Sequence, residues 1–226
     1  MIHKLLFTNK LEDKDIAIGI VLAHNVHLTN PLPSLEAKLR FLLEDRQQDK
    51  LTETEESFRV ESRNMLRNGD YKPTGRGKPA SEYLYREVQN GNFPRINTIV
   101  DINNFISLKY MVPISIWDLD QAATSQYVFR LGKDDESYIF NESEQRIDLK
   151  DLVAGFKVEH YTETPIINPI KDSMKTKITT STKNVGAAIY FPLKAGSKDY
   201  LRHEIIWEFT TLINGVSEGE PEYDII

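Results

Sequence analysis

The stretch that decides the fold is FPRINTIVDINNFISLKYMVP, residues 93–113. Its apolar residues recur at the three- and four-residue intervals of a helix, at Ile99, Ile102, Phe105 and Ile106. Pro94 precedes the run and Pro113 ends it. The run therefore predicts a buried helix, although its isoleucines and valine leave a strand as the alternative.

Four polar residues interrupt this apolar run. On a helix, Asn97, Asp101 and Asn104 share one stripe, and Asn103 faces another side. Buried amides and carboxylates must find partners. Two explanations remain open: these residues are caps and turn formers, or they are polar groups held in a site.

The rest of the chain predicts an α+β protein. A continuous β-branched run at residues 15–26 is typical of a buried strand. Helices are expected over 30–47, with Ser34 as N-cap, over 52–69, with Thr54 as cap, and over 80–91 and 198–215. Short β runs are expected at 125–132, 137–142, 146–149, 155–162, 175–182 and 186–193.

This order of elements is helix-rich first, then β-rich, with a helix near the end. It favours a β-sandwich or mixed sheet layers flanked by helices, rather than alternating βαβ units. We expect a single domain over residues 1–226, with a core at about 10–215 and a flexible acidic tail at 216–226.

Composition narrows the class of protein. The 226 residues include no cysteine, which excludes disulfides and thiolate metal sites. No apolar run is long enough for a membrane span or a signal peptide, so a soluble cytoplasmic protein is expected. No phosphate loop, dinucleotide fingerprint or nucleophile elbow is present, and the five histidines suggest no metal site. We expect no cofactor and no metal.

Charge is unevenly distributed. The chain has a formal net charge of −6, yet residues 59–95 hold eight Lys or Arg against four Asp or Glu. This basic stretch is either a solvated helical face or a phosphate-facing patch. The acidic total argues against a general binder of nucleic acid, and DNA is not an expected partner.

The central segment resembles a known family. PRINTIVDINNFISLKYMVPISIWDLDQ, residues 94–121, is similar to the B3/B4 module of the phenylalanyl-tRNA synthetase beta subunit and to its free-standing relatives. VFRLG at 128–132, KDSMKTKITTSTKNV at 171–185 and YKPTGRGKPASEYL at 71–84 resemble flanking parts of that module.

The resemblance implies an editing-like protein that hydrolyses mischarged, tyrosyl-tRNA-like esters in trans. It implies candidate catalytic residues Asn104 and Ser115, and candidate substrate-binding residues Asn97, Asn103 and Asp172. Ser115 stands where the synthetase has a histidine, and serine cannot serve as the same base. Together, the resemblance and the basic stretch suggest that Arg63, Arg67, Lys72, Arg76 and Lys78 bind tRNA.

Two other functions stay open beside this one. One is a non-catalytic protein that binds tRNA or an amino acid and retains the pocket. The other is a hydrolase of small esters that does not contact RNA. Aminoacylated tRNA is the expected partner, and no membrane partner is expected; the oligomeric state, the amino acid and the tRNA stay open.

Overall fold

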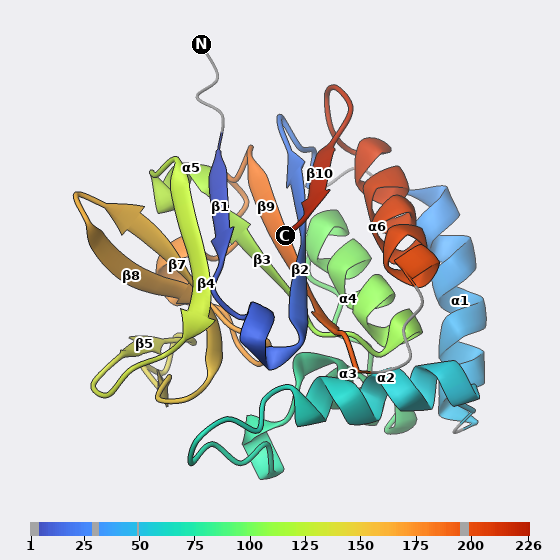
Figure 1. Ribbon diagram of the computed structural model, residues 1–226. Coiled ribbons are helices and arrows are strands. Elements are labelled where there is room, and N and C mark those ends of the chain that lie inside the picture. Colours follow the sequence, from blue (N-terminus) through green and yellow to red (C-terminus); the bar gives the residue numbers. More distant parts are fainter. Residues whose placement is uncertain (1–4, 29–31, 49, 195–198) are drawn as a thin grey trace.

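A computed structural model describes residues 5–28, 32–48, 50–194 and 199–226. The elements form three layers: a group of helices, a central sheet and an outer sheet (Figure 1). Part of the expected first helix (residues 30 and 31) and the first residue of the expected last helix (198) lie outside the described residues.

The central sheet has four strands in the order β10-β2-β9-β3. Their bounds are β2 Ile16–Ala23, β3 Ile114–Asp118, β9 Val185–Pro192 and β10 Glu222–Ile225. All three pairings in this sheet are antiparallel. The apolar run expected as a buried strand is β2, which pairs along its whole length with β9.

The outer sheet has the order β1-β4-β7-β8. Its strands are β1 Leu6–Asn9, β4 Gln126–Leu131, β7 Val153–Glu159 and β8 Thr162–Ile167. β1 and β4 are parallel, while the other two pairs are antiparallel. A separate two-stranded sheet joins β5 Ser137–Ile139 to β6 Arg146–Asp148.

Five of the six helices in the described residues cover one face of the central sheet, while the short helix Leu119–Ala122 packs in the core between the two sheets (Figure 1). Their bounds are α1 Pro33–Gln47, α2 Glu53–Asn64, α3 Ala80–Gln89, α4 Thr98–Tyr110, α5 Leu119–Ala122 and α6 Asp199–Asn214. Single 3-10 turns are η1 Glu12–Lys14, η2 Gly75–Gly77 and η3 Met174–Thr176. No helix in the described part of the chain is long and apolar enough to cross a membrane.

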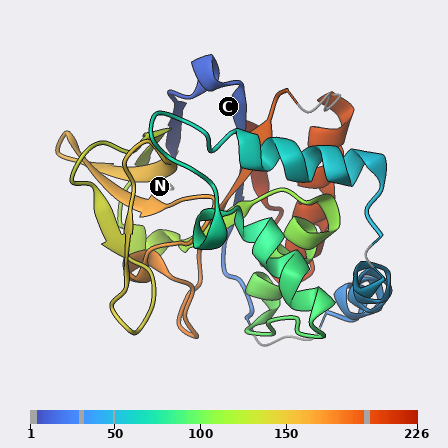
Figure 2. The same cartoon turned by 90° about the horizontal axis from the view of Figure 1, so that it is seen from below.

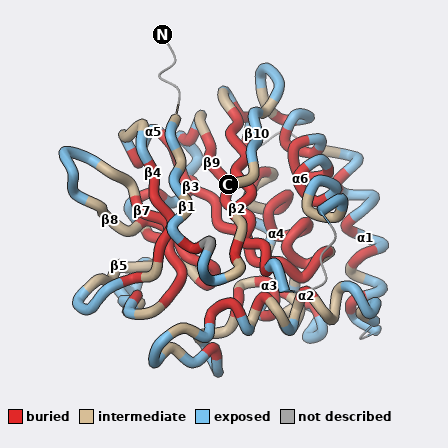
Figure 3. Tube along the Cα trace, viewed as in Figure 1, coloured by how far each residue is buried: buried red, intermediate tan, exposed pale blue. Residues whose placement is uncertain are grey.

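The strands β2, β3 and β9 of the central sheet are buried on both faces, whereas β10 is largely exposed (Figure 3). Alternate residues of a strand point to opposite faces. On β9, Ala187 and Ile189 therefore face the helical core, and Ala188 and Tyr190 face the core between the sheets. On β3, Ile114 and Ile116 face the helices, while Trp117 faces the outer sheet.

The sequence predicted the α+β class and the helix at 93–113, which is α4, and both are confirmed. Two caps were wrong. Leu32 rather than Ser34 precedes α1, because Pro33 already occupies the first helical position. Thr52 rather than Thr54 caps α2, in a reciprocal capping box with Glu55.

One expected strand and the expected flexible tail were also wrong. Residues 175–182 form turns and part of η3 instead of a strand, because their hydroxyls bond locally, as Thr182 Oγ1 does to the N–H of Thr179. The tail is not a free end, since β10 pairs with the open edge of β2. That pairing satisfies backbone groups of β2 that an edge strand would leave open.

Gly186 tests how tightly the central sheet is packed. A Cβ at this position would lie 2.4 Å from the ring of the fully buried Trp117. We predict that Gly186→Ala lowers the free energy of unfolding by about 1–3 kcal/mol, because a full core resists an added methyl group. Chemical denaturation would measure this. The exposed Thr211→Ala is the control, and equal stability of the two variants would contradict the packing.

Candidate functional site

Two of the polar residues of the opening segment organise the start of α4. The side chain of Asn97 accepts a hydrogen bond from the N–H of Val100 at 3.0 Å, as an N-cap does. Asp101 accepts from the N–H of Ile96 at 2.9 Å and from Arg95 Nε at 2.7 Å. Arg95 also pairs with Glu36 of α1. The side-chain oxygens of Asn97 and Asp101 are therefore engaged within the fold.

Asn103 and Asn104 behave differently, because they are buried in the middle of the helix. Asn103 Nδ2 donates to Asn104 Oδ1 at 3.3 Å. Asn103 Oδ1 is shielded from solvent and has no hydrogen-bond partner in the described structure. A buried acceptor without a partner is costly, so this amide pair is a candidate contact for a ligand.

The chain turns sharply from α4 into β3. Met111 takes the left-handed conformation (φ 55°), and Ser107 Oγ donates to the carbonyl of Val112 at 2.7 Å. Since Ile114 and Ile116 face the helices, Ser115 faces the outer sheet. The central sheet therefore separates the Ser115 hydroxyl from α4, and the described contacts do not bring Asn104 to Ser115 or Asp172.

Ser115 belongs to a group of five residues, which we call the polar cluster: Ser115, Tyr138, Asn168, Asp172 and Tyr190. Four of them are buried, and Asp172 is half-buried with a shielded carboxyl group. Ser115 Oγ accepts from Tyr190 OH at 3.1 Å and donates to the carbonyl of Asn168 at 2.9 Å. Asn168 Nδ2 donates to Tyr138 OH at 2.5 Å, which donates in turn to the carbonyl of Lys171 at 2.6 Å. The cluster thus joins β3, β5, β9 and the segment after β8.

Asp172 completes the cluster at the open edge of β3. Its Oδ2 accepts from the N–H of Ile116 at 3.2 Å. Its Oδ1 is shielded from solvent and lacks a hydrogen-bond partner among the described residues. The structure therefore brings together two predicted site residues that lie far apart in sequence, Ser115 and Asp172.

The surroundings alter the ionisation of Asp172. Burial raises its pKa to about 7, against the opposing effects of the Ser115 hydroxyl, the backbone N–H groups of Ile116 and Asn168, and the charge of Lys177. The Ser115 hydroxyl has one hydrogen, so its bond to the Asn168 carbonyl competes with donation to Asp172. Near neutral pH, Asp172 can therefore act as a hydrogen-bond donor or as an acceptor.

The predicted tRNA-binding residues fall into two groups. Arg63 pairs with Glu82, so its charge is compensated inside the protein. Within the described ranges, the other four make no ion pair; Arg67, Lys72 and Arg76 are exposed, and Lys78 is half-buried. Four of the five predicted cations are therefore free to meet an external anion.

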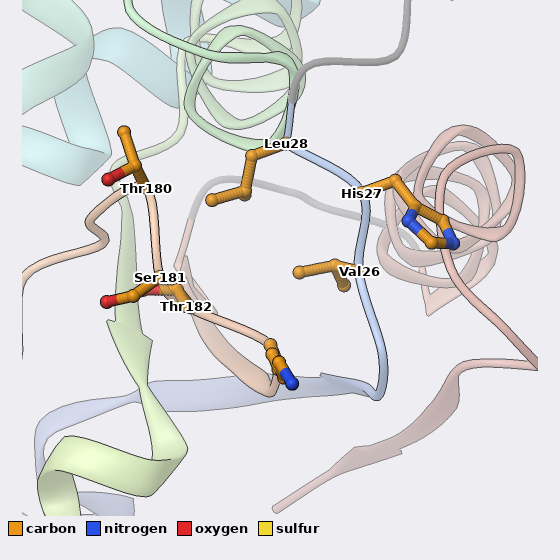
Figure 4. A pocket seen from close by; sticks show the side chains of 7 residues that line it. Val26, His27, Leu28, Thr180, Ser181 and Thr182 are labelled. Carbon is orange, nitrogen blue, oxygen red and sulfur yellow. The ribbon is translucent and has the colours of Figure 1, made fainter.

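A hollow of about 330 Å³ lies between residues 26–28 and the threonine-rich residues 180–183 (Figure 4). Val26 and Leu28 point across it toward Thr180–Thr182, and His27 points away. Thr182 Oγ1 donates to Asp118 Oδ2 at 2.6 Å, and Asp118 also caps α5. The predicted site residues do not line this hollow, which is a separate feature from the polar cluster.

Sequence reasoning missed three members of the polar cluster. Asn168 precedes Pro169, a pairing typical of a turn, while Tyr138 and Tyr190 sit in apolar strand runs with no local mark of a site. Only the tertiary pairing of β3 with β9 brings Tyr190 to Ser115. Among the described residues, no group of three or more His, Asp or Glu is placed to hold a metal ion.

A helix layer, a two-sided central sheet and an outer sheet, with a polar cluster buried between the two sheets, define a three-layer α+β protein. The chain belongs to the B3/4 domain family, whose sequence profile matches residues 73–195. All five residues of the polar cluster, and both Asn103 and Asn104, lie inside the matched segment.

Several curated proteins are similar to this segment. The phenylalanine–tRNA ligase beta subunit of Streptococcus agalactiae is 27% identical over 108 residues, which is 47% of this chain and 13% of that protein. The corresponding subunit of Oceanobacillus iheyensis is 27% identical over 109 residues, 48% of this chain and 13% of that protein. The chain therefore matches about an eighth of the length of these relatives.

A solved structure also shows a likeness. It is an N-terminal fragment of the phenylalanyl-tRNA synthetase beta subunit from Pyrococcus horikoshii, with a TM-score of 0.45 and 11% identity. The superposition covers 100% of this chain and 52% of that one.

The raised pKa of Asp172 predicts an unusual pH dependence of stability. Unfolded Asp loses its proton near pH 4, whereas the folded residue keeps its proton until about pH 7. Its stabilising contribution is therefore complete at low pH and is lost as pH rises from about 4 through about 7, with a slope of at most about 1.4 kcal/mol per pH unit.

We predict that Asp172→Asn removes this slope. The measurement is the free energy of unfolding between pH 5 and 7.5. At lower pH, Glu136 and Glu163 would give a slope of the opposite sign, because their pKa values are lowered in the folded protein. The exposed Asp148→Asn is the matched control. Parallel pH curves for wild type and Asp172→Asn would show that Asp172 ionises normally.

Proposed function

We propose that this chain hydrolyses the ester of a mischarged aminoacyl-tRNA, of the tyrosyl-tRNA type, and acts in trans on tRNA charged elsewhere. The observation that carries the proposal is the meeting of Ser115 and Asp172 in one buried cluster within the B3/4 segment. The resemblance to the synthetase module implied both residues, yet they lie far apart in sequence.

Hydrolysis of an aminoacyl ester requires few catalytic groups from the protein. An aminoacyl ester is already activated, so a positioned water and donors for the developing oxyanion suffice. Asp172 Oδ1 accepts a hydrogen bond from the hydroxyl or ammonium group of the amino acid, because it has no partner within the fold. The Ser115 hydroxyl, beside it, orients the attacking water or the amino group.

The Asn103–Asn104 pair has a separate role in this proposal. It lies on the opposite side of the central sheet from Ser115, so it does not contact the same atom of the substrate. Its unpartnered acceptor, Asn103 Oδ1, suits an amino or hydroxyl group elsewhere on the aminoacyl-adenosine end. Asn97, as the N-cap of α4, positions this pair rather than contacting the substrate.

A second function is favoured by one observation. Ser115 Oγ already accepts from Tyr190 and donates to the Asn168 carbonyl, so its hydrogen is used within the fold. A protein that binds aminoacyl-tRNA or an amino acid without hydrolysing it fits a serine held in this way. A hydrolase acting on small esters is the third possibility that the experiment must separate.

We predict that purified protein accelerates the loss of tyrosine from mischarged phenylalanine tRNA. Asp172→Asn should slow this about 10- to 100-fold, because a hydrogen bond to a charged group contributes roughly 1.5–3 kcal/mol. The assay follows ester loss from tyrosyl-tRNA, phenylalanyl-tRNA and a panel of other mischarged tRNAs, beside a reaction without protein.

Asp148→Asn is the control for Asp172→Asn, and Ser115→Ala and Asn104→Ala test the two sides of the sheet separately. Undiminished rates in Asn104→Ala remove the amide pair from the site, and undiminished rates in Asp172→Asn remove the polar cluster. Salt-sensitive tRNA binding without ester loss establishes the binding function instead. Turnover of small esters without tRNA affinity establishes the third.

A further inference from the structure

Two basic segments far apart in sequence are joined to one another. Residues 71–80 contain η2, and residues 168–178 contain η3. The N–H of Ala80 donates to the carbonyl of Pro169 at 2.9 Å, which joins the two segments. Tyr71 OH donates to the carbonyl of Gly77 at 3.0 Å and fixes the first segment internally. Figure 2, seen from below, looks onto the 71–80 loop.

The two segments together, which we call the basic seam, contain six cations: Lys72, Arg76, Lys78, Lys171, Lys175 and Lys177. The same two segments contain a single acid, Asp172, whose carboxylate belongs to the buried cluster. Within the part of the chain that the structure describes, none of the six cations forms an ion pair with an acid. Most charged pairs of the protein lie elsewhere, as in Arg130 with Glu136 and Glu163.

Two of the cations are held close to one another without a counter-ion. Lys171 is half-buried, with its Nζ 3.8 Å from the centre of the Phe140 ring. Burial and the nearby charge of Arg76 lower the pKa of Lys171. Asp70 immediately precedes the first segment in sequence. Its backbone N–H donates to the Asp151 carboxylate, and its charge acts on Lys150. Like charges gathered in this way favour an external polyanion.

We infer that the basic seam binds the phosphate backbone of RNA next to the polar cluster, with residues 171–177 contributing as much as the loop at 72–78. This rests on the proposed function for the choice of RNA as the polyanion. Lys171 and Lys177 flank Asp172 in sequence, and the charge of Lys177 acts on its carboxyl group, so RNA held along the seam would lie close to Asp172. The acidic remainder of the protein would limit binding to this one surface.

The test measures binding of uncharged tRNA by fluorescence anisotropy between 50 and 200 mM KCl. Arg76→Ala/Lys171→Ala should flatten the salt dependence of the logarithm of affinity by about 1.5 and weaken binding roughly 30-fold at 0.1 M salt. Arg40→Ala/Lys50→Ala makes the same change in net charge at exposed positions of α1 and beyond its end, and should leave the slope unchanged.

Because Lys171 also packs on Phe140, its substitution could lower stability, and a second variant that leaves this contact intact is needed. Lys72→Ala/Lys175→Ala removes two exposed cations, which should give a similar loss without altering the unfolding midpoint. Equal losses in seam and α1 variants, or tighter binding of duplex DNA than of tRNA, would overturn the inference. Because uncharged tRNA has no ester, seam-dependent binding without deacylation would refute the proposed hydrolysis alone. If the seam variants deacylate tRNA at the wild-type rate, this inference alone would be refuted.

Discussion

The structure depends on three strands of the central sheet, β2, β3 and β9, which are buried on both faces. Because β3 and β9 have an apolar layer on each side, every polar side chain on these strands must find its partners inside the protein. Tyr190 meets this requirement by donating to the Ser115 hydroxyl, which donates in turn to the Asn168 carbonyl. The Asp172 segment lies along the open edge of β3 and provides the acceptor for the N–H of Ile116. The polar cluster is therefore a consequence of the two-sided sheet.

Most of the buried polar groups around α4 and β3 have hydrogen-bond partners within the protein. Most polar atoms around α4 and β3 are tied to neighbouring main chain, as in Asn97, Asp101 and Ser107. Asp172 Oδ1 and Asn103 Oδ1 have no such partner in the described structure. A buried acceptor without a donor costs free energy, and a ligand that donates to it recovers that cost. These two acceptors lie on opposite sides of the sheet, and Trp117 Nε1 on β3 is a buried donor that also lacks a partner among the described residues.

The sequence predicted those features that depend on local periodicity. The 3.6-residue spacing of Ile99, Ile102 and Ile106 was enough to predict α4, and the β-branched run was enough to predict β2. The threonine-rich residues 175–182 were wrongly predicted to form a strand, because β-branched side chains with hydroxyls also occur in turns. The cap of α1 was misplaced because Pro33 already begins the helix, and the cap of α2 because Thr52 and Thr54 are both candidates.

The composition of the site was harder to predict than the fold. Resemblance to a family identified Ser115 and Asp172, but it could not show that Tyr138, Asn168 and Tyr190 surround them. Those contacts arise from pairing between distant strands, which leaves no periodic mark in the sequence. Resemblance also grouped Asn104 with Ser115, and the strand alternation of β3 places the two on different faces.

The central claim is that Asp172 is a ligand-facing acid. The most direct measurement is the ¹³C chemical shift of its side-chain carboxyl against pH, with and without a non-hydrolysable amide analogue of tyrosyl-adenosine. The account predicts a midpoint near 7 in the free protein and a clear displacement of that midpoint when the analogue binds. A midpoint near 4 that the analogue leaves in place would contradict it.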